Sequence, residues 1–168
     1  PRLVDRHPQV SDDRLLAEMV PPPQFHDVAF ETYRPDAAQP TQAAAVAALR
    51  AFAAQVSAGR SGSASNARRR WSGRAPVEAE RRPGVYLDGG FGVGKTHLLA
   101  SLWHAAEVPP AEKVFCTFVE MTNLVGTLGF AATVSRLSTF RLVCIDEFEL
   151  DDPGDTVLMS TLLGRLSD

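Results

Sequence analysis

The sequence is short of residues that form disulfides and metal clusters, with only two cysteines and four histidines in 168 residues. Cys116 and Cys144 both lie in apolar, β-rich runs, so we expect two small buried side chains. A disulfide between them is disfavoured in a reducing cytosol. His97 and His104 are placed to share one helix face, but a metal site needs more ligands nearby. The sequence therefore predicts neither a disulfide nor a histidine metal site.

Long apolar runs are absent as well. No run approaches the roughly 20 apolar residues that span a bilayer, and residues 1–5 lack the apolar core of a signal peptide. We therefore expect a cytoplasmic protein without a membrane span. The net charge is −3 and the pI is about 5.8, a balance that does not favour nucleic-acid binding by the whole chain. The length and the 45% hydrophobic content suit one globular domain.

The composition changes along the chain. Residues 1–40 are rich in proline and predict an N-terminal extension, in which Ser11 caps a short helix. A clear helix opens at Thr41 and is ended by Gly59. Residues 59–83 combine glycine and serine with seven arginines between Arg60 and Arg82. This stretch predicts a flexible loop, and a phosphate-binding patch is the alternative.

From Gly84 onward, apolar strands alternate with helices. We expect strands at 85–87, 114–119 and 142–145, and helices at 95–106, 122–128, 131–137 and after Pro153. Strands separated by helices imply parallel pairing. The sequence therefore predicts an α/β fold, a three-layer parallel-sheet domain, over residues 41–168.

A phosphate-binding motif stands between the first of these strands and the first helix. Residues 89–96 fit the pattern G-x-x-x-x-G-K-[ST]. Such a loop needs backbone angles that glycine tolerates, and its N–H groups together with the helix N-terminus attract an anion. We expect Lys95 to pair with the β- and γ-phosphates and Thr96 to ligate Mg²⁺. The candidate ATP-binding residues are Gly89, Gly90, Phe91, Gly92, Val93, Gly94, Lys95, Thr96 and His97.

A second motif is the apolar run 142–145 followed by two acids. A continuous apolar run is typical of a buried parallel strand, and ligands gather at the carboxyl ends of such strands. We expect Asp146 to hold Mg²⁺ through its water shell and Glu147 to activate the attacking water as a general base. Following a complete phosphate loop, the pair predicts a P-loop NTPase domain that hydrolyses a nucleotide, with Lys95 and Glu147 as the catalytic residues.

Together the two motifs resemble the ZapE-type ATPases of the AAA+ superfamily. The resemblance covers most of the chain from about residue 25 and is carried by Pro83–Gly90 leading into Gly94-Lys95-Thr96, and by Asp146-Glu147-Phe148-Glu149-Leu150 with Asp152 and Asp155. It implies ATP and Mg²⁺ as ligands and places Glu31–Gln39 on the adenine side. ZapE-type proteins act in the cytoplasm on polymers of the tubulin-like protein FtsZ. The resemblance therefore implies FtsZ or another division protein as a partner.

The resemblance also sets expectations about the end of the chain. The family continues beyond the acidic motif with a sensor strand, an arginine finger and a helical lid, whereas this sequence stops at Asp168. We therefore expect the C-terminal part of the ATPase domain to be missing, and poor hydrolysis by the chain alone. An arginine finger is worth roughly 10³–10⁵ in rate. AAA+ relatives commonly form hexamers, so a homo-oligomer is implied for the full-length protein.

Two other functions fit parts of the sequence. Residues 94–99 also resemble DnaA- and DnaC-like replication ATPases, in which the arginine-rich stretch would contact DNA. The acidic motif with Asp152 and Asp155 favours the ZapE type instead. The second alternative is a non-hydrolysing module, in which ATP binding exposes a surface that a partner protein recognises.

Overall fold

The computed structural model describes residues 12–59, 84–148 and 152–167. Ser11, residues 60–83, Glu149 and Leu150 lie outside the described residues, so what the sequence predicts for them stays a prediction. In chain order the elements are α1 (Asp12–Ala17), η2 (Pro23–Phe25), α2 (Pro40–Ala58), α4 (Lys95–Ala105), η3 (Pro110–Glu112), β1 (Lys113–Thr117), α5 (Phe118–Leu128), α6 (Phe130–Leu137), β2 (Leu142–Asp146) and α7 (Pro153–Ser167).

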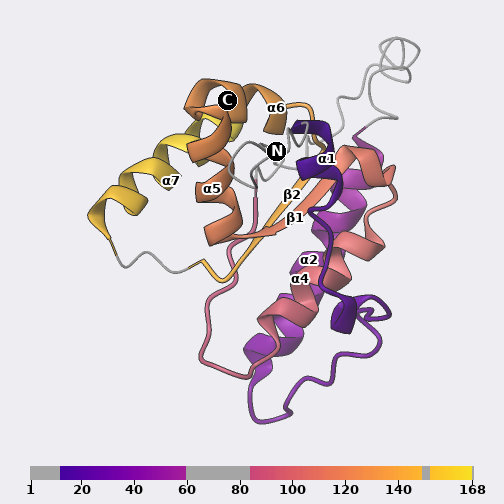
Figure 1. The fold of residues 1–168 in the computed structure, drawn as a ribbon. Coiled ribbons are helices and arrows are strands. Elements are labelled where there is room, and N and C mark those ends of the chain that lie inside the picture. Colours follow the sequence, from indigo (N-terminus) through magenta and orange to yellow (C-terminus); the bar gives the residue numbers. More distant parts are fainter. Residues whose placement is uncertain (1–11, 60–83, 149–151, 168) are drawn as a thin grey trace, which may run out of the picture.

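Two parallel strands form the centre of the fold. β1 pairs with β2, with Phe115 opposite Cys144 and Thr117 opposite Asp146. Helices α2 and α4 lie on one side of the pair and α5, α6 and α7 on the other (Figure 1). The structure is thus the predicted mixed α/β fold with a small parallel sheet between helical layers. None of the helices in the described ranges is long and apolar enough to cross a membrane.

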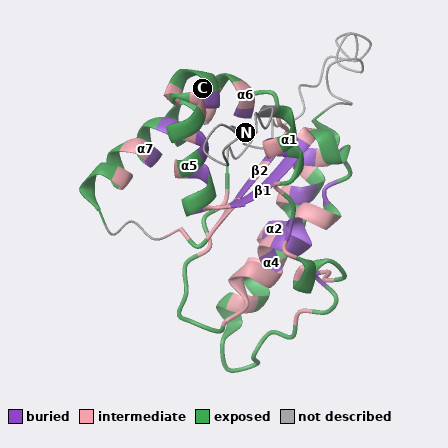
Figure 2. Ribbon diagram, in the orientation of Figure 1, coloured by how far each residue is buried: buried purple, intermediate pink, exposed green. Residues whose placement is uncertain are grey.

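Side chains alternate between the two faces of this sheet, as the period of a strand requires. Phe115 and Cys144 point into a core shared with α2 and α4, whereas Val114 and Cys116 point into a second core shared with α1, α5, α6 and α7. Four of the five residues of β1 are buried, whereas in β2 buried and half-buried residues alternate before the half-buried end of the strand (Figure 2). The sheet therefore separates two hydrophobic cores and determines where the ends of both strands reach the surface.

The N-terminal residues are packed against both cores. Leu16 of α1 is buried in the second core, and Phe30 is buried in the first. The backbone N–H of Phe115 donates to the carbonyl of Met19 at 2.9 Å, which satisfies part of the outer edge of β1. The N-terminal residues are therefore part of the packed structure, while the domain boundary at residue 41 stays a prediction.

Two of the three strand predictions were wrong: the strand at 85–87 is absent, and the strand predicted at 114–119 is shorter. Residues 85–87 form no strand, because no strand among the described residues lies beside them to supply ladder hydrogen bonds. Their burial still alternates, with Val85 and Leu87 half-buried and Tyr86 exposed. The second strand ends at Thr117 rather than at Val119 because a capping box starts α5 there: Glu120 accepts from the Thr117 N–H, and Thr117 Oγ1 accepts from the Glu120 N–H.

Candidate nucleotide-binding site

The glycine-rich loop before α4 is closed by its own lysine. Lys95 Nζ donates to the carbonyl of Gly89 at 2.6 Å and to that of Gly90 at 2.9 Å. The ammonium therefore lies across the mouth of the loop, at the first turn of α4, where the motif requires a positive charge. At the tip, Phe91 is 97% exposed and contributes no packing that would explain the loop.

Glycine is required at two positions of this loop. Gly92 has φ of 75° and Gly94 has φ of 85°, values in the left-handed region that side chains rarely adopt. A Cβ on Gly90 or Gly92 would meet nothing within 4 Å, so there is open space beside the loop at these two glycines. Gly94 is the N-cap of α4 and gives it no side-chain cap. The first N–H groups of the helix are thus left for a ligand that accepts hydrogen bonds.

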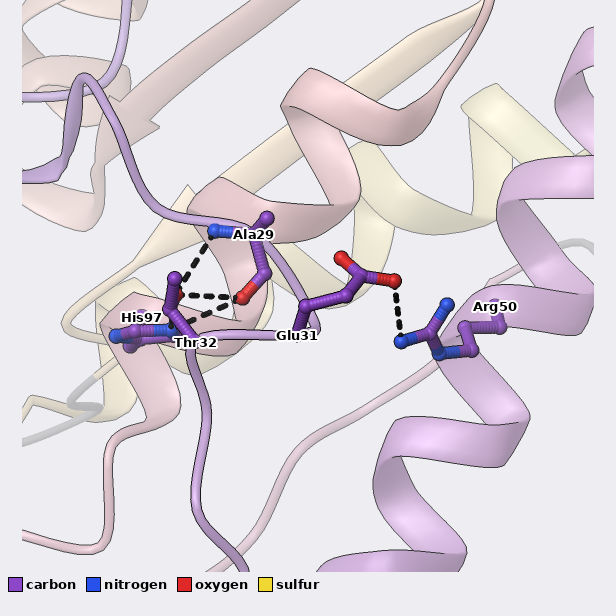
Figure 3. A network of polar contacts seen from close by, with 5 residues as sticks. All are labelled: Ala29, Glu31, Thr32, Arg50 and His97. Carbon is purple, nitrogen blue, oxygen red and sulfur yellow. Dashed lines mark hydrogen bonds and ion pairs between the residues drawn. The ribbon is translucent and has the colours of Figure 1, made fainter.

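A segment far away in the sequence lies against this loop. Tyr33 Oη donates to the carbonyl of Val93 at 2.8 Å, and the Tyr33 ring lies 5.7 Å from the His97 ring. His97 Nε2 is 2.9 Å from Thr32 Oγ1 and 3.3 Å from the Ala29 carbonyl. Figure 3 shows His97 of α4 turned toward Ala29 and Thr32. The sequence predicts His97 as one of the nucleotide-binding residues and contains no signal for its contacts with Ala29, Thr32 and Tyr33.

The two acids lie at the carboxyl end of β2, which extends one residue further than the predicted strand 142–145. Asp146 is the last residue of β2 and is half-buried, while Glu147 is exposed. Glu147 has φ of 51°, and it is the only non-glycine residue with positive φ in the described part of the chain. A non-glycine residue held in this backbone conformation costs about 1–2 kcal/mol, and such strain clusters at functional sites. The backbone therefore turns sharply at the carboxyl end of β2 and directs Glu147 out of the core.

The two motifs are joined by aromatic contacts. The ring of Phe148 lies 6.2 Å from that of Tyr86, which precedes the glycine loop, and 5.8 Å from that of Phe118 at the start of α5. The segment before the glycine loop and the segment after the two acids therefore meet beyond the carboxyl ends of β1 and β2. No hydrogen bond or ion pair joins Asp146 or Glu147 to the loop among the described residues.

The residues present fit a nucleotide with a divalent cation. The loop offers N–H donors, an ammonium and open space, which suit phosphates. The Thr96 hydroxyl and the Asp146 carboxylate have no hydrogen-bond or ion-pair partner in the described ranges, and both are hard oxygen ligands of the kind Mg²⁺ prefers. Within the same ranges, no three His, Cys, Asp or Glu residues gather into a metal site. A magnesium ion would therefore need ligands from the nucleotide and water.

The cysteines behave as the sequence predicts. Both are free and buried, on opposite faces of the sheet. Burial raises the pKa of the Cys116 thiol to about 12 and raises the pKa of Cys144 even more. His104 Nε2 donates to the Phe25 carbonyl at 2.9 Å and so holds η2 against α4. Because a carbonyl oxygen only accepts, Nε2 carries the proton in this contact.

A cavity elsewhere does not compete with this site. It measures about 540 Å³ and lies between α2 and the end of α4, where four alanines line it together with Phe30, Arg50, Ser57 and Glu107. None of its lining residues belongs to the glycine loop or to the acidic pair. The polar groups that could hold a phosphate converge at the loop instead.

Comparison with protein families decides the class. The model of the AFG1-like ATPase family matches residues 9–168. The chain belongs to the AFG1-like ATPase family. This is the AAA+ P-loop ATPase family that also contains the ZapE-type proteins, so the predicted class is confirmed at that level. Searches of curated proteins and of solved structures gave no match. Membership of an ATPase family makes a nucleoside triphosphate the substrate class.

Proposed function

We propose that this AFG1-like chain binds ATP with Mg²⁺ at the loop from Gly89 to Thr96 and hydrolyses it with Asp146 and Glu147. The proposed ATPase domain runs over residues 41–168, with residues 1–40 as an extension. One observation carries the proposal. Lys95 closes a loop with two left-handed glycines directly before a helix whose N-terminus has no side-chain cap.

Each residue has a defined task in this proposal. Backbone N–H groups of the loop and of α4 hold the phosphates, and Lys95 exchanges the Gly89 and Gly90 carbonyls for phosphate oxygens. Thr96 and Asp146 hold Mg²⁺, which when bound neutralises charge on the β- and γ-phosphates. Glu147, exposed and turned outward by its positive φ, takes the proton of the attacking water.

Binding is tested with a fluorescent ATP analogue and Mg²⁺, comparing the chain with Lys95→Ala. We expect binding that is lost in the variant and reduced by removing Mg²⁺. Hydrolysis is tested with Glu147→Gln, which should keep ATP affinity and lose turnover by about 10²–10⁴-fold. If the chain and Lys95→Ala bind equally, the loop is not the nucleotide site. If the chain binds ATP but its turnover is no higher than that of Glu147→Gln, a non-hydrolysing module is the better function.

For the biological role we propose a ZapE-type cytoplasmic motor that acts on FtsZ or another division protein, as a hexamer when full length. Support comes from the acidic motif with Asp152 and Asp155 and from the family match. The test is ATP-dependent change in FtsZ polymer mass by sedimentation. Salt-dependent DNA binding without any effect on FtsZ would favour the DnaA- or DnaC-like alternative.

A further inference from the structure

The contacts of the segment 29–33 with the phosphate loop have no explanation in the proposed chemistry. Tyr33 and Val93 are 60 positions apart in the sequence, yet the Tyr33 hydroxyl donates to the Val93 carbonyl at 2.8 Å and is partly buried. This is a long-range side-chain hydrogen bond to the backbone of the loop itself. It joins a segment outside the proposed ATPase domain to the group of residues that holds phosphate.

This hydrogen bond fixes the orientation of one peptide unit. A trans peptide is planar, and its C=O and N–H point in opposite directions. The described part of the chain has no cis peptide, so holding the Val93 carbonyl toward Tyr33 turns the N–H of Gly94 away from Tyr33. That N–H is one of the donors that a phosphate loop uses to bind an anion. The Tyr33 hydroxyl thus determines where one of these donors points.

The Tyr33 ring also sets the space at the next residue. A Cβ on Gly94 would lie 2.8 Å from Tyr33 Cε2, so the ring occupies the volume that any side chain would need there. The conformation of Gly94, with φ of 85°, is therefore enclosed by the ring on one side. The hydroxyl and the ring of Tyr33 thus act on two adjacent residues of the loop, Val93 and Gly94.

The segment that carries Tyr33 is itself anchored. The Thr32 hydroxyl donates to the Ala29 carbonyl at 2.8 Å, so its oxygen is free to accept from His97 Nε2–H at 2.9 Å. Glu31 accepts from Arg50 of α2 at 2.7 Å, and this hydrogen bond lowers the pKa of Glu31. Figure 3 shows the two anchors on either side of the segment. Tyr33 is thus held between α4 and α2 rather than on a free loop.

From this geometry we propose that Tyr33 is a positioning residue that sets the phosphate loop for anion binding, through the Val93–Gly94 peptide. The inference rests on the proposed function, since it needs a nucleotide at the loop. This role differs from an adenine contact in one respect that can be measured. Loss of the Tyr33 hydroxyl should weaken the binding of any ligand with the phosphate chain, whether or not that ligand has a base.

The experiment compares Tyr33→Phe with the chain as it is, using two ligands. Kd is measured for a fluorescent ATP analogue with Mg²⁺, and tripolyphosphate, which has no base, is measured by competition against it. The matched control is Tyr86→Phe. Tyr86 is the other of the two tyrosines, is 72% exposed, and its hydroxyl has no hydrogen-bond partner in the described ranges. Thermal unfolding of both variants checks that they are folded.

We expect Tyr33→Phe to weaken both ligands by the same factor, about 2- to 10-fold, which corresponds to one lost hydrogen bond. Tyr86→Phe should change neither. Weaker binding of the ATP analogue with unchanged tripolyphosphate would overturn the inference in favour of a base contact, and unchanged binding of both would overturn it altogether. If the unaltered chain binds neither ligand, the proposed function itself fails, which is a distinct result.

Discussion

The ammonium of Lys113 lies 4.2 Å from the centre of the Trp103 ring and donates to the Trp103 carbonyl at 2.7 Å. It also donates to the Ala106 carbonyl at 3.1 Å, so a buried side chain at the start of β1 closes the C-terminal end of α4. Burial lowers the pKa of Lys113, because the charged form loses solvent. The lysine therefore links the helix that begins at the phosphate loop to the strand that ends beside Asp146.

We predict that Lys113→Met lowers the free energy of unfolding by about 1–3 kcal/mol, because two carbonyls lose their donor. Methionine keeps most of the apolar stem, so the loss reports the ammonium rather than a cavity. Urea denaturation of the two proteins measures the difference. An unchanged midpoint would mean that water replaces the ammonium at both carbonyls.

Glycines 90 and 94 should respond very differently to alanine. Gly94→Ala meets a positive φ and a contact of 2.8 Å with Tyr33, whereas a Cβ on Gly90 meets nothing within 4 Å. We expect Gly94→Ala to cost about 1–3 kcal/mol of stability and Gly90→Ala to change it by at most about 0.5 kcal/mol. Thermal unfolding of the pair is the measurement. Equal losses would show that the loop does not hold Gly94 in this conformation.

Much of this fold could be predicted because its signals are local. The phosphate loop, the helix after it and the apolar run before Asp146 are each read from a few adjacent residues. The capping box at Thr117 and Glu120 is equally local, and it could have placed the end of β1 correctly. The strand at 85–87 could not be decided in this way, since a strand depends on a neighbour that its own sequence does not specify.

The contacts of the candidate site beyond its motifs could not be predicted. Tyr33 lies in a proline-rich segment without periodicity, and nothing nearby indicates that its hydroxyl meets Val93. The same holds for Thr32 and His97, whose pairing spans 65 positions. Such contacts depend on how the segment crosses α2 and α4, which is a property of the whole fold.

The two cysteines give a prediction about pH. Their pKa values are raised, that of Cys116 to about 12 from 9.0, so above pH 9 the folded chain keeps protons that the unfolded chain releases. Their contribution to stability is therefore full below pH 9 and falls as pH rises from 9 toward 12. The control is the Cys116→Ala/Cys144→Ala chain, which lacks this dependence. We expect the difference in urea midpoint between the two proteins to shrink from pH 8 to pH 10; a constant difference would contradict thiol burial as its cause.

Lysine labelling offers a direct test of the loop, because the sequence contains only Lys95 and Lys113. Lys113 is 7% exposed and bound to two carbonyls, whereas Lys95 is half-buried at the open loop. An amine-acylating reagent should therefore modify Lys95 in the native chain and reach Lys113 only after unfolding. ATP with Mg²⁺ should protect Lys95, since the ammonium then faces phosphate oxygens. Peptide mass spectrometry resolves the two sites, and Lys95 acylation that proceeds equally with and without saturating ATP would place the nucleotide away from this lysine.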